Sequence, residues 1–218
     1  MTTTADGQEG SQARRLRSSD ISIRNLERGA ELIACDRLFC MRNEKKRMMR
    51  NPETFLLPPN GEIPNNRQLP VVLYRNVLNK FLPHKADKFE SVFRANGWRG
   101  TWRDSVYPYC HFHSNAHEVL GIARGHVAME LGGADGRTVR LNAGDLVLLP
   151  AGVGHRRVRG SANLLVVGAY PAGQQHYNIC KSLRECRSAN KRIAAVALPQ
   201  SDPFFGPLGP LKKIWRQQ

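Results

Sequence analysis

Long apolar segments are missing from this chain of 218 residues. No stretch approaches the roughly 18–20 consecutive apolar residues that a membrane-spanning helix needs. Residues 1–20 are polar and include Arg14, Arg15 and Arg17, whereas a secretory signal would need an apolar core. We therefore expect a soluble, cytoplasmic protein. Hydrophobic residues make up 41% of the chain, which is enough for one folded domain with appendages.

Cysteines are few, and their spacing matches no known kind of site. They are an odd number, five, and none of the gaps between them is typical of zinc ligands: Cys35, Cys40, Cys110, Cys180 and Cys186. This pattern argues against a disulfide framework and against a zinc knuckle. We expect most of them to be small packing residues.

Acidic residues are scarce relative to basic ones. The chain has 18 Asp and Glu against 33 Lys and Arg, a net charge of +15. The excess is spread out, because residues 1–50 hold 11 basic and 7 acidic residues and the remainder holds 22 and 11. No helix-turn-helix, zinc-finger or aromatic RNA-binding pattern accompanies it, so nucleic-acid binding is not expected. An attraction for small anionic molecules or anionic surfaces is the milder inference.

Residues 1–50 differ in composition from the rest of the chain. Ser, Thr, Gly and Arg dominate their beginning, so we expect a weakly structured basic extension followed by a single domain over 51–218. Met48 and Met49 offer a second possible translation start, which leaves open whether residues 1–48 belong to the native protein. A targeting presequence is the rival interpretation, but the acidic residues of this stretch argue against it.

The rest of the chain has mainly β character. Residues 69–74 are predicted as a strand, and residues 83–95 as an amphipathic helix that ends at Asn96-Gly97. Short strands without intervening helices follow, which predicts a barrel or sandwich: 107–113, 118–123, 127–131, 138–141, 146–149, 155–158 and 164–169. A helix over 178–193 should cover it. The Pro- and Gly-rich tail over 202–211 could pack on its own barrel or on a neighbouring subunit.

Four side chains in this β region have the chemistry of metal ligands. His111 and His113 are two residues apart, so on a strand both point to the same face. With Glu118 and His155 they make three imidazoles and one carboxylate, a donor set that suits divalent first-row metals. We therefore predict that these four residues hold one divalent transition metal. Fe, Mn, Ni and Zn all remain open.

The spacing of these residues resembles the two motifs of the cupin superfamily. The first motif is met by His111, His113, Glu118 and Gly125, and the second by Gly144, Pro150, Gly152 and His155. Ser105 and Arg159 stand where the motifs usually have Gly and Asn, and neither position is a metal ligand.

A wider stretch, from about Pro52 to Trp215, is similar to the YjlB-like single-domain cupins, through segments 56–61, 63–66, 117–121 and 202–211. The resemblance implies a mainly β fold, the cupin jelly-roll β-barrel with a few flanking helices. It places the metal-motif core at 105–170 and implies a homodimer.

Two further residues are candidates for substrate binding. Strand parity makes Arg157 the inward neighbour of His155, where a guanidinium could clamp a carboxylate or phosphate; a solvated rim is the alternative. Tyr109 shares a face with His111 and could donate a hydrogen bond to a bound oxygen, or could serve only as packing. His117 should point away from Glu118, as packing or as support for a ligand.

These observations leave three functions open. The leading hypothesis is a metal-dependent enzyme that acts on a small anionic organic molecule, with a dioxygenase-like oxidoreductase favoured. A metal-dependent isomerase or decarboxylase would use Mn, Ni or Zn as a Lewis acid. A non-catalytic ligand-binding or sensing cupin is the alternative from another class, because a fold does not determine an activity.

Overall fold

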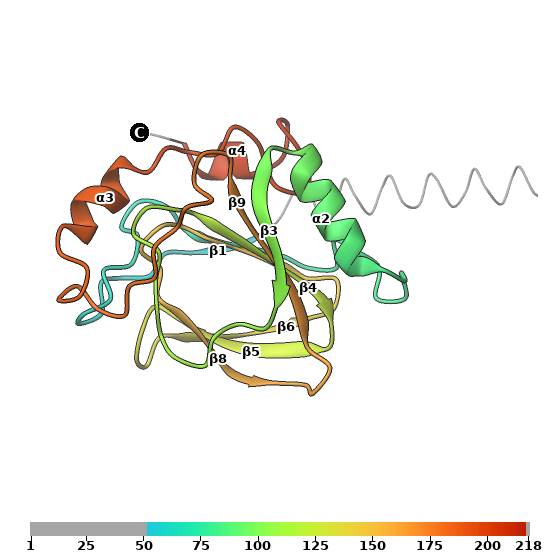
Figure 1. Cartoon of the computed structure of the whole chain (residues 1–218), viewed down its shortest axis with the longest axis horizontal. Coiled ribbons are helices and arrows are strands. Elements are labelled where there is room, and N and C mark those ends of the chain that lie inside the picture. The colour runs from blue at the N-terminus through green and yellow to red at the C-terminus, as the bar shows by residue number, and fades with distance from the viewer. Residues whose placement is uncertain (1–51, 217–218) are drawn as a thin grey trace, which may run out of the picture. The chain divides into compact units, whose positions relative to one another are not determined.

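The structure is a computed structural model and describes residues 52–216 (Figure 1). The predictions for the N-terminal extension and the second start, and for Cys35 and Cys40, lie outside the described residues. In chain order the elements are β1 (Glu53–Phe55), β2 (Val71–Tyr74), α2 (Lys85–Ala95), β3 (Trp98–Asp104), β4 (Glu118–Arg124), β5 (His126–Leu131), β6 (Arg137–Asn142), β7 (Leu146–Leu149), β8 (His155–Gly160), β9 (Leu165–Pro171), α3 (Ala189–Ala195) and α4 (Leu211–Ile214).

Two antiparallel sheets face each other and form a barrel (Figure 1). The larger sheet has six strands in the order β1-β2-β7-β4-β9-β3, and the smaller has three in the order β6-β5-β8. The predicted mainly β jelly-roll barrel with a few flanking helices is confirmed. Within residues 52–216, no helix has the length and apolar character needed to cross a membrane.

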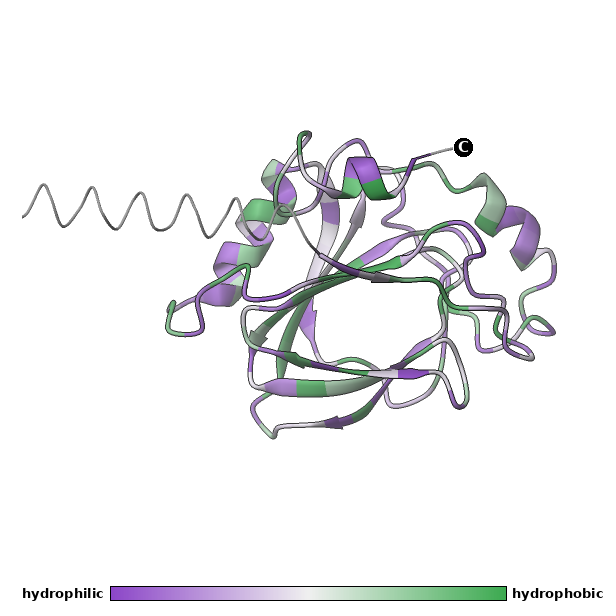
Figure 2. Ribbon diagram, turned by 180° about the vertical axis from the view of Figure 1, so that it is seen from behind, coloured by the Kyte–Doolittle hydropathy of each residue, from purple (hydrophilic) through white to green (hydrophobic). Residues whose placement is uncertain are grey.

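The central strands of the six-stranded sheet are buried on both faces, and they carry apolar residues at consecutive positions. In β2 all four residues are buried. Val71 and Leu73 belong to the apolar interior of the barrel, whereas Val72 and Tyr74 join a second cluster on the outer face, where α2 packs. Figure 2 shows the hydrophobic residues concentrated along the strands.

The C-terminal tail folds on its own barrel, which decides a question that the sequence left open. The carboxylate of Asp202 is fully buried in it. One oxygen accepts hydrogen bonds from the backbone N–H groups of Phe204 and Phe205, both at 2.9 Å. The other accepts from the Tyr74 hydroxyl at 2.5 Å and from the Leu211 N–H at 3.2 Å. This carboxylate therefore anchors the tail to strand β2.

The structure corrects one predicted strand and adds two, β1 and β3. Residues 107–113 form only isolated bridges, His111 with His155 and Phe112 with Cys180. Pro108 has no N–H to donate to a ladder, so a continuous strand cannot form there. Strand β3 was not predicted, because among its seven residues only Trp98 is fully buried and the alternation is weak.

The helix predicted over 178–193 is wrong in its first part, since α3 begins only at Ala189. The Ser182 hydroxyl accepts a hydrogen bond from the Glu185 N–H at 3.1 Å, a local bond that favours turns over helix. A disulfide joins Cys180 to Cys186, whose Cα atoms are 5.7 Å apart. The expectation that most of the cysteines are small packing residues is wrong for this pair.

Candidate metal centre

Backbone hydrogen bonds bring the three histidines together, although only His155 lies on a strand, at the start of β8. The His111 N–H donates to the His155 carbonyl at 3.2 Å, and the His155 N–H donates back at 2.8 Å. The Gly152 N–H donates to the His113 carbonyl at 2.8 Å. Gly152 has a φ of +91°, which glycine adopts without strain. This turn therefore ties the His113 loop to the loop that precedes β8.

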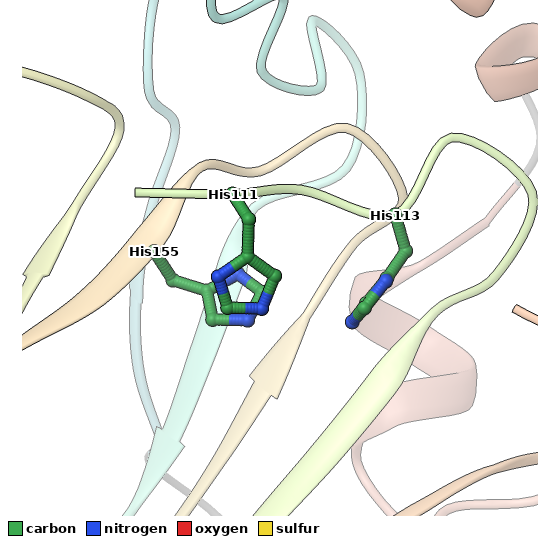
Figure 3. Close-up of side chains that lie close together, drawn as sticks. All are labelled: His111, His113 and His155. Carbon is green, nitrogen blue, oxygen red and sulfur yellow. The ribbon is translucent and has the colours of Figure 1, made fainter. Parts of the chain in front are cut away.

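Each imidazole is oriented through its Nδ1 atom. That atom faces a backbone carbonyl oxygen at 2.5–3.2 Å: Tyr109 for His111, Asn178 for His113 and Val153 for His155. A carbonyl oxygen can only accept, so Nδ1 carries a proton, and in the neutral ring Nε2 keeps a free lone pair. One ligand atom from each ring lies within 4.8 Å of the others. Figure 3 shows His111 and His155 close together, with His113 beside them.

Glu118, the first residue of β4, adds a carboxylate at the same place. Its Oε1 accepts a hydrogen bond from the Tyr170 hydroxyl at 2.8 Å. Its Oε2 lies 3.4 Å from His113 Nε2 and 3.3 Å from His155 Nε2, and this buried atom has no hydrogen-bond partner. The Nε2 atoms of the neutral rings also offer lone pairs. The Glu118 oxygen and these nitrogens are therefore acceptors that face one another.

The electrostatics favour a neutral imidazole beside an ionised carboxylate. Burial, and then the neighbouring His155 and His113, lowers the pKa of His111 to about 3. Burial by itself raises the pKa of Glu118, but the two histidines beside it outweigh burial and hold that pKa well below its usual range. Burial by itself lowers the pKa of His113, but the coupling to Glu118 outweighs burial and raises that pKa, so this ring would release its Nε2 proton when a metal binds.

A divalent cation fits this donor set. Buried acceptors that face one another cost free energy, and a cation between them would satisfy all of them. The anchored Nδ1–H groups match the usual support of metal-binding histidines, whose second ring nitrogen donates to a carbonyl or carboxylate. The three imidazoles can therefore hold one metal ion, and the Glu118 carboxylate lies beside two of them as a candidate fourth ligand.

Comparison with known proteins identifies the family. No family model matches the chain. The uncharacterized protein YjlB of Bacillus subtilis (strain 168) is 38% identical over 168 residues, which are 77% of this chain and 99% of that protein. The chain belongs to the YjlB family. It is a YjlB-like cupin, as the two motifs predicted.

Solved structures with a similar fold have low sequence identity to this YjlB-like chain. An acireductone dioxygenase from Bacillus anthracis, with a cadmium ion in its active centre, is 18% identical; the match covers 48% of this chain and 79% of that one, with a TM-score of 0.35. A DUF861 family protein from Thermotoga maritima is 22% identical, and the match covers 47% and 98%, with a TM-score of 0.27.

A cavity of about 190 Å³ opens at the candidate metal centre of this YjlB-like cupin. Its wall contains the four predicted ligands. Four aromatic residues and one acidic residue also line it: Trp102, Tyr107, Tyr170, Tyr177 and Asp104.

The two residues predicted to bind substrate lie apart from this cavity. Tyr109 stacks on Tyr107, with ring centroids 4.9 Å apart, and only Tyr107 lines the cavity. Arg157 does not line it either, and its side chain extends along β8 towards Gly160. Both assignments remain predictions without support from the cavity wall.

His117 points away from the centre, as its parity with Glu118 predicted. Its Nδ1 accepts the Ala151 N–H at 2.9 Å, and its ring packs against Trp215 with centroids 4.8 Å apart. Burial lowers its pKa to about 3, so the ring is neutral. It therefore joins strand β4 to the C-terminal tail.

The residues that support Glu118 were missed in the sequence. The Trp102 indole N–H donates to the Tyr170 hydroxyl at 3.0 Å, and this hydroxyl donates to Glu118. A Cβ atom on Gly168 would lie 2.0 Å from the Trp102 ring, so only glycine leaves room for that indole. The alternation along β9 could have indicated that Gly168 and Tyr170 share a face, but no motif marks them.

Proposed function

We propose that this YjlB-like cupin is a metal-dependent enzyme that acts on a small organic molecule. One observation carries the proposal: on the wall of a cavity, three histidines bring one ligand atom each within 4.8 Å of the others, and the unpartnered Glu118 Oε2 lies beside two of them. A purely structural metal site is usually closed on all sides by protein, whereas a catalytic one keeps a position open. The open cavity beside the donors favours the catalytic kind.

In this proposal His111, His113, His155 and Glu118 hold the metal, and a six-coordinate ion keeps about two positions for reactants. Tyr170 fixes the Glu118 carboxylate through its hydrogen bond to Oε1. The bound metal would supply an electrophilic centre and, if it is iron, redox chemistry.

Among the reactions, we favour a dioxygenase-like oxidoreductase, and a metal-dependent isomerase or decarboxylase is the alternative. The same donor set serves both, and the metal decides between them. The net charge suggested an anionic substrate. Among residues 52–216, Arg103 is the only Lys or Arg on the cavity wall. Its guanidinium is bound to Glu90 and Asp87 on α2, so the proposal does not include an anionic charge on the substrate.

The proposal is tested by measuring whether the bound metal carries exchangeable water. Protein loaded with Mn²⁺ should strongly enhance the relaxation of water protons, because exchangeable water would occupy the open positions. Relaxation no faster than that of a closed coordination sphere would contradict the enzymatic role and favour the non-catalytic binding protein. His155→Ala, loaded in the same way, is the control for adventitious surface manganese.

We also propose a cytoplasmic homodimer, an assembly that only the resemblance implies. Size-exclusion chromatography with light scattering tests it, and a monomer at micromolar concentration would count against it.

Alkylation of freshly lysed cells would report whether Cys180 and Cys186 are joined in the native compartment, because a reducing cytoplasm disfavours disulfides.

A further inference from the structure

The rings on the cavity wall flank the candidate centre on two sides. On one side the Tyr107 ring meets His111 edge to face, with centroids 5.3 Å apart. On the other side the Tyr177 ring meets His113 in the same way at 4.8 Å, and it stacks on Tyr170 at 4.2 Å. A ligand that reaches the centre must therefore pass between aromatic surfaces.

These surfaces are available to a ligand. Tyr107 is 44% exposed and Tyr177 is 36% exposed, although each touches a buried histidine. Partly exposed aromatic rings beside a polar centre favour a flat ligand, because rings pack on one another in offset or edge-to-face contacts. A planar ring bound at this wall would add a further aromatic contact to those already made there by Tyr107 and Tyr177.

The charges on the wall disfavour an anionic group away from the metal. The Arg103 guanidinium is bound to Glu90 at 2.8 Å and to Asp87 at 2.5 Å, so it does not serve the cavity. Asp104 lines the cavity and has no ion-pair partner among residues 52–216. A carboxylate on the outer part of a ligand would meet Asp104 without a compensating cation, and like charges repel.

The size of the cavity suits a ligand with one ring. Its volume is about 190 Å³, while an engineered protein cavity of about 150 Å³ binds benzene. One ring with a short metal-binding group therefore fits inside, and a fused pair of rings would protrude.

We propose that the substrate is a single planar ring that binds the metal through its own oxygen atoms and carries no further anionic group. This inference rests on the proposed function, because it takes the metal as the point of attachment. Tyr177 and Tyr107 hold the ring, and Asp104 rejects substrates with a distal carboxylate.

Three hydroxamates test the inference on zinc-loaded protein, because they share one metal-binding group. Acetohydroxamate has no ring, benzohydroxamate adds one, and 4-carboxybenzohydroxamate adds a charge to that ring. Zinc has no redox chemistry, so calorimetry would measure binding alone. We expect benzohydroxamate to bind about tenfold more tightly than the other two, the size of one good aromatic contact.

Variants assign the effect to residues. Tyr177→Ala should remove most of the benzohydroxamate advantage while zinc content stays unchanged, and Tyr177→Phe should keep the advantage because it keeps the ring. Asp104→Asn should strengthen the binding of 4-carboxybenzohydroxamate, whereas Asp135→Asn, in an exposed turn of the small sheet, should not.

The outcomes separate the two proposals. Zinc bound at one equivalent, with acetohydroxamate or 4-carboxybenzohydroxamate as tight as benzohydroxamate, would overturn the ring inference and leave the metal enzyme standing. An unchanged advantage in Tyr177→Ala would also overturn it. A protein that takes up no zinc would overturn both proposals.

Discussion

Two buried polar clusters in this protein differ in how their acceptors are satisfied. At the tail anchor, the two oxygens of Asp202 receive four hydrogen bonds from within the chain. At the candidate metal centre, Glu118 Oε2 and the histidine Nε2 atoms face one another, and Oε2 has no donor.

The difference separates a structural role from a binding role. Buried polar groups with a full set of partners stabilise a fold, whereas buried acceptors without donors cost free energy unless a ligand completes them. The tail anchor is complete in the protein alone, and the histidine cluster becomes complete with a cation. Mutations at the two places should therefore change different measured quantities.

The largest expected effect is on metal affinity. Loss of a residue that only supports a metal ligand typically weakens metal binding by about 10–100-fold. His111→Ala and His155→Ala remove ligands themselves, so they should weaken metal binding by more than about 100-fold. Competition with a metal-sensitive dye measures this affinity. Affinity within a few-fold of wild type in both variants would show that the cluster is not the site.

The matched change at the tail anchor is Asp202→Ala. It leaves the Tyr74 hydroxyl and buried N–H groups without an acceptor, which should lower the free energy of unfolding by about 3 kcal/mol. Urea denaturation of the metal-free protein measures it. Metal affinity should stay within about twofold of wild type, and a large loss of metal with unchanged stability would reverse the assignment of the two clusters.

An intermediate effect is expected for Tyr170→Phe, which removes the hydroxyl that holds Glu118 Oε1. Metal affinity should fall about tenfold, because supporting residues orient the ligands. The aromatic wall stays in place, so benzohydroxamate should still bind the zinc-loaded variant more tightly than acetohydroxamate. If metal affinity does not change, the hydrogen bond does not position the carboxylate.

The smallest effect is expected for Arg157→Ala, which removes a guanidinium that lies outside the cavity wall. The dissociation constant of 4-carboxybenzohydroxamate should change by less than about twofold, within the small range of distant surface changes. A tenfold loss would instead support the carboxylate clamp predicted from strand parity.

The four candidate ligands could be predicted from the sequence because each of the two motifs is defined by the spacing of residues close together in the chain. A histidine pair two residues apart needs only an extended backbone, and His111 and His113 obtain it from short bridges without a full strand. The jelly roll followed in the same way from short apolar segments with turns between them.

The support around the ligands depends on sheet register, which the sequence does not state. Trp102 reaches Tyr170 because β3 pairs with β9 and Gly168 leaves space for the indole. Parity correctly indicates which face a side chain takes, but not its direction along the strand, so Arg157 could extend away from His155. Cys180 also forms a bridge with the distant Phe112, a pairing that the sequence does not indicate.

The central claim is that the histidine cluster is a metal centre, and elemental analysis tests it most directly. The full chain would be purified anaerobically without an affinity tag, beside His155→Ala and Asp202→Ala. We predict about one equivalent of a divalent transition metal in wild type and in Asp202→Ala, and almost none in His155→Ala. No metal in the wild-type protein under any loading condition, or equal metal in all three, would contradict the account.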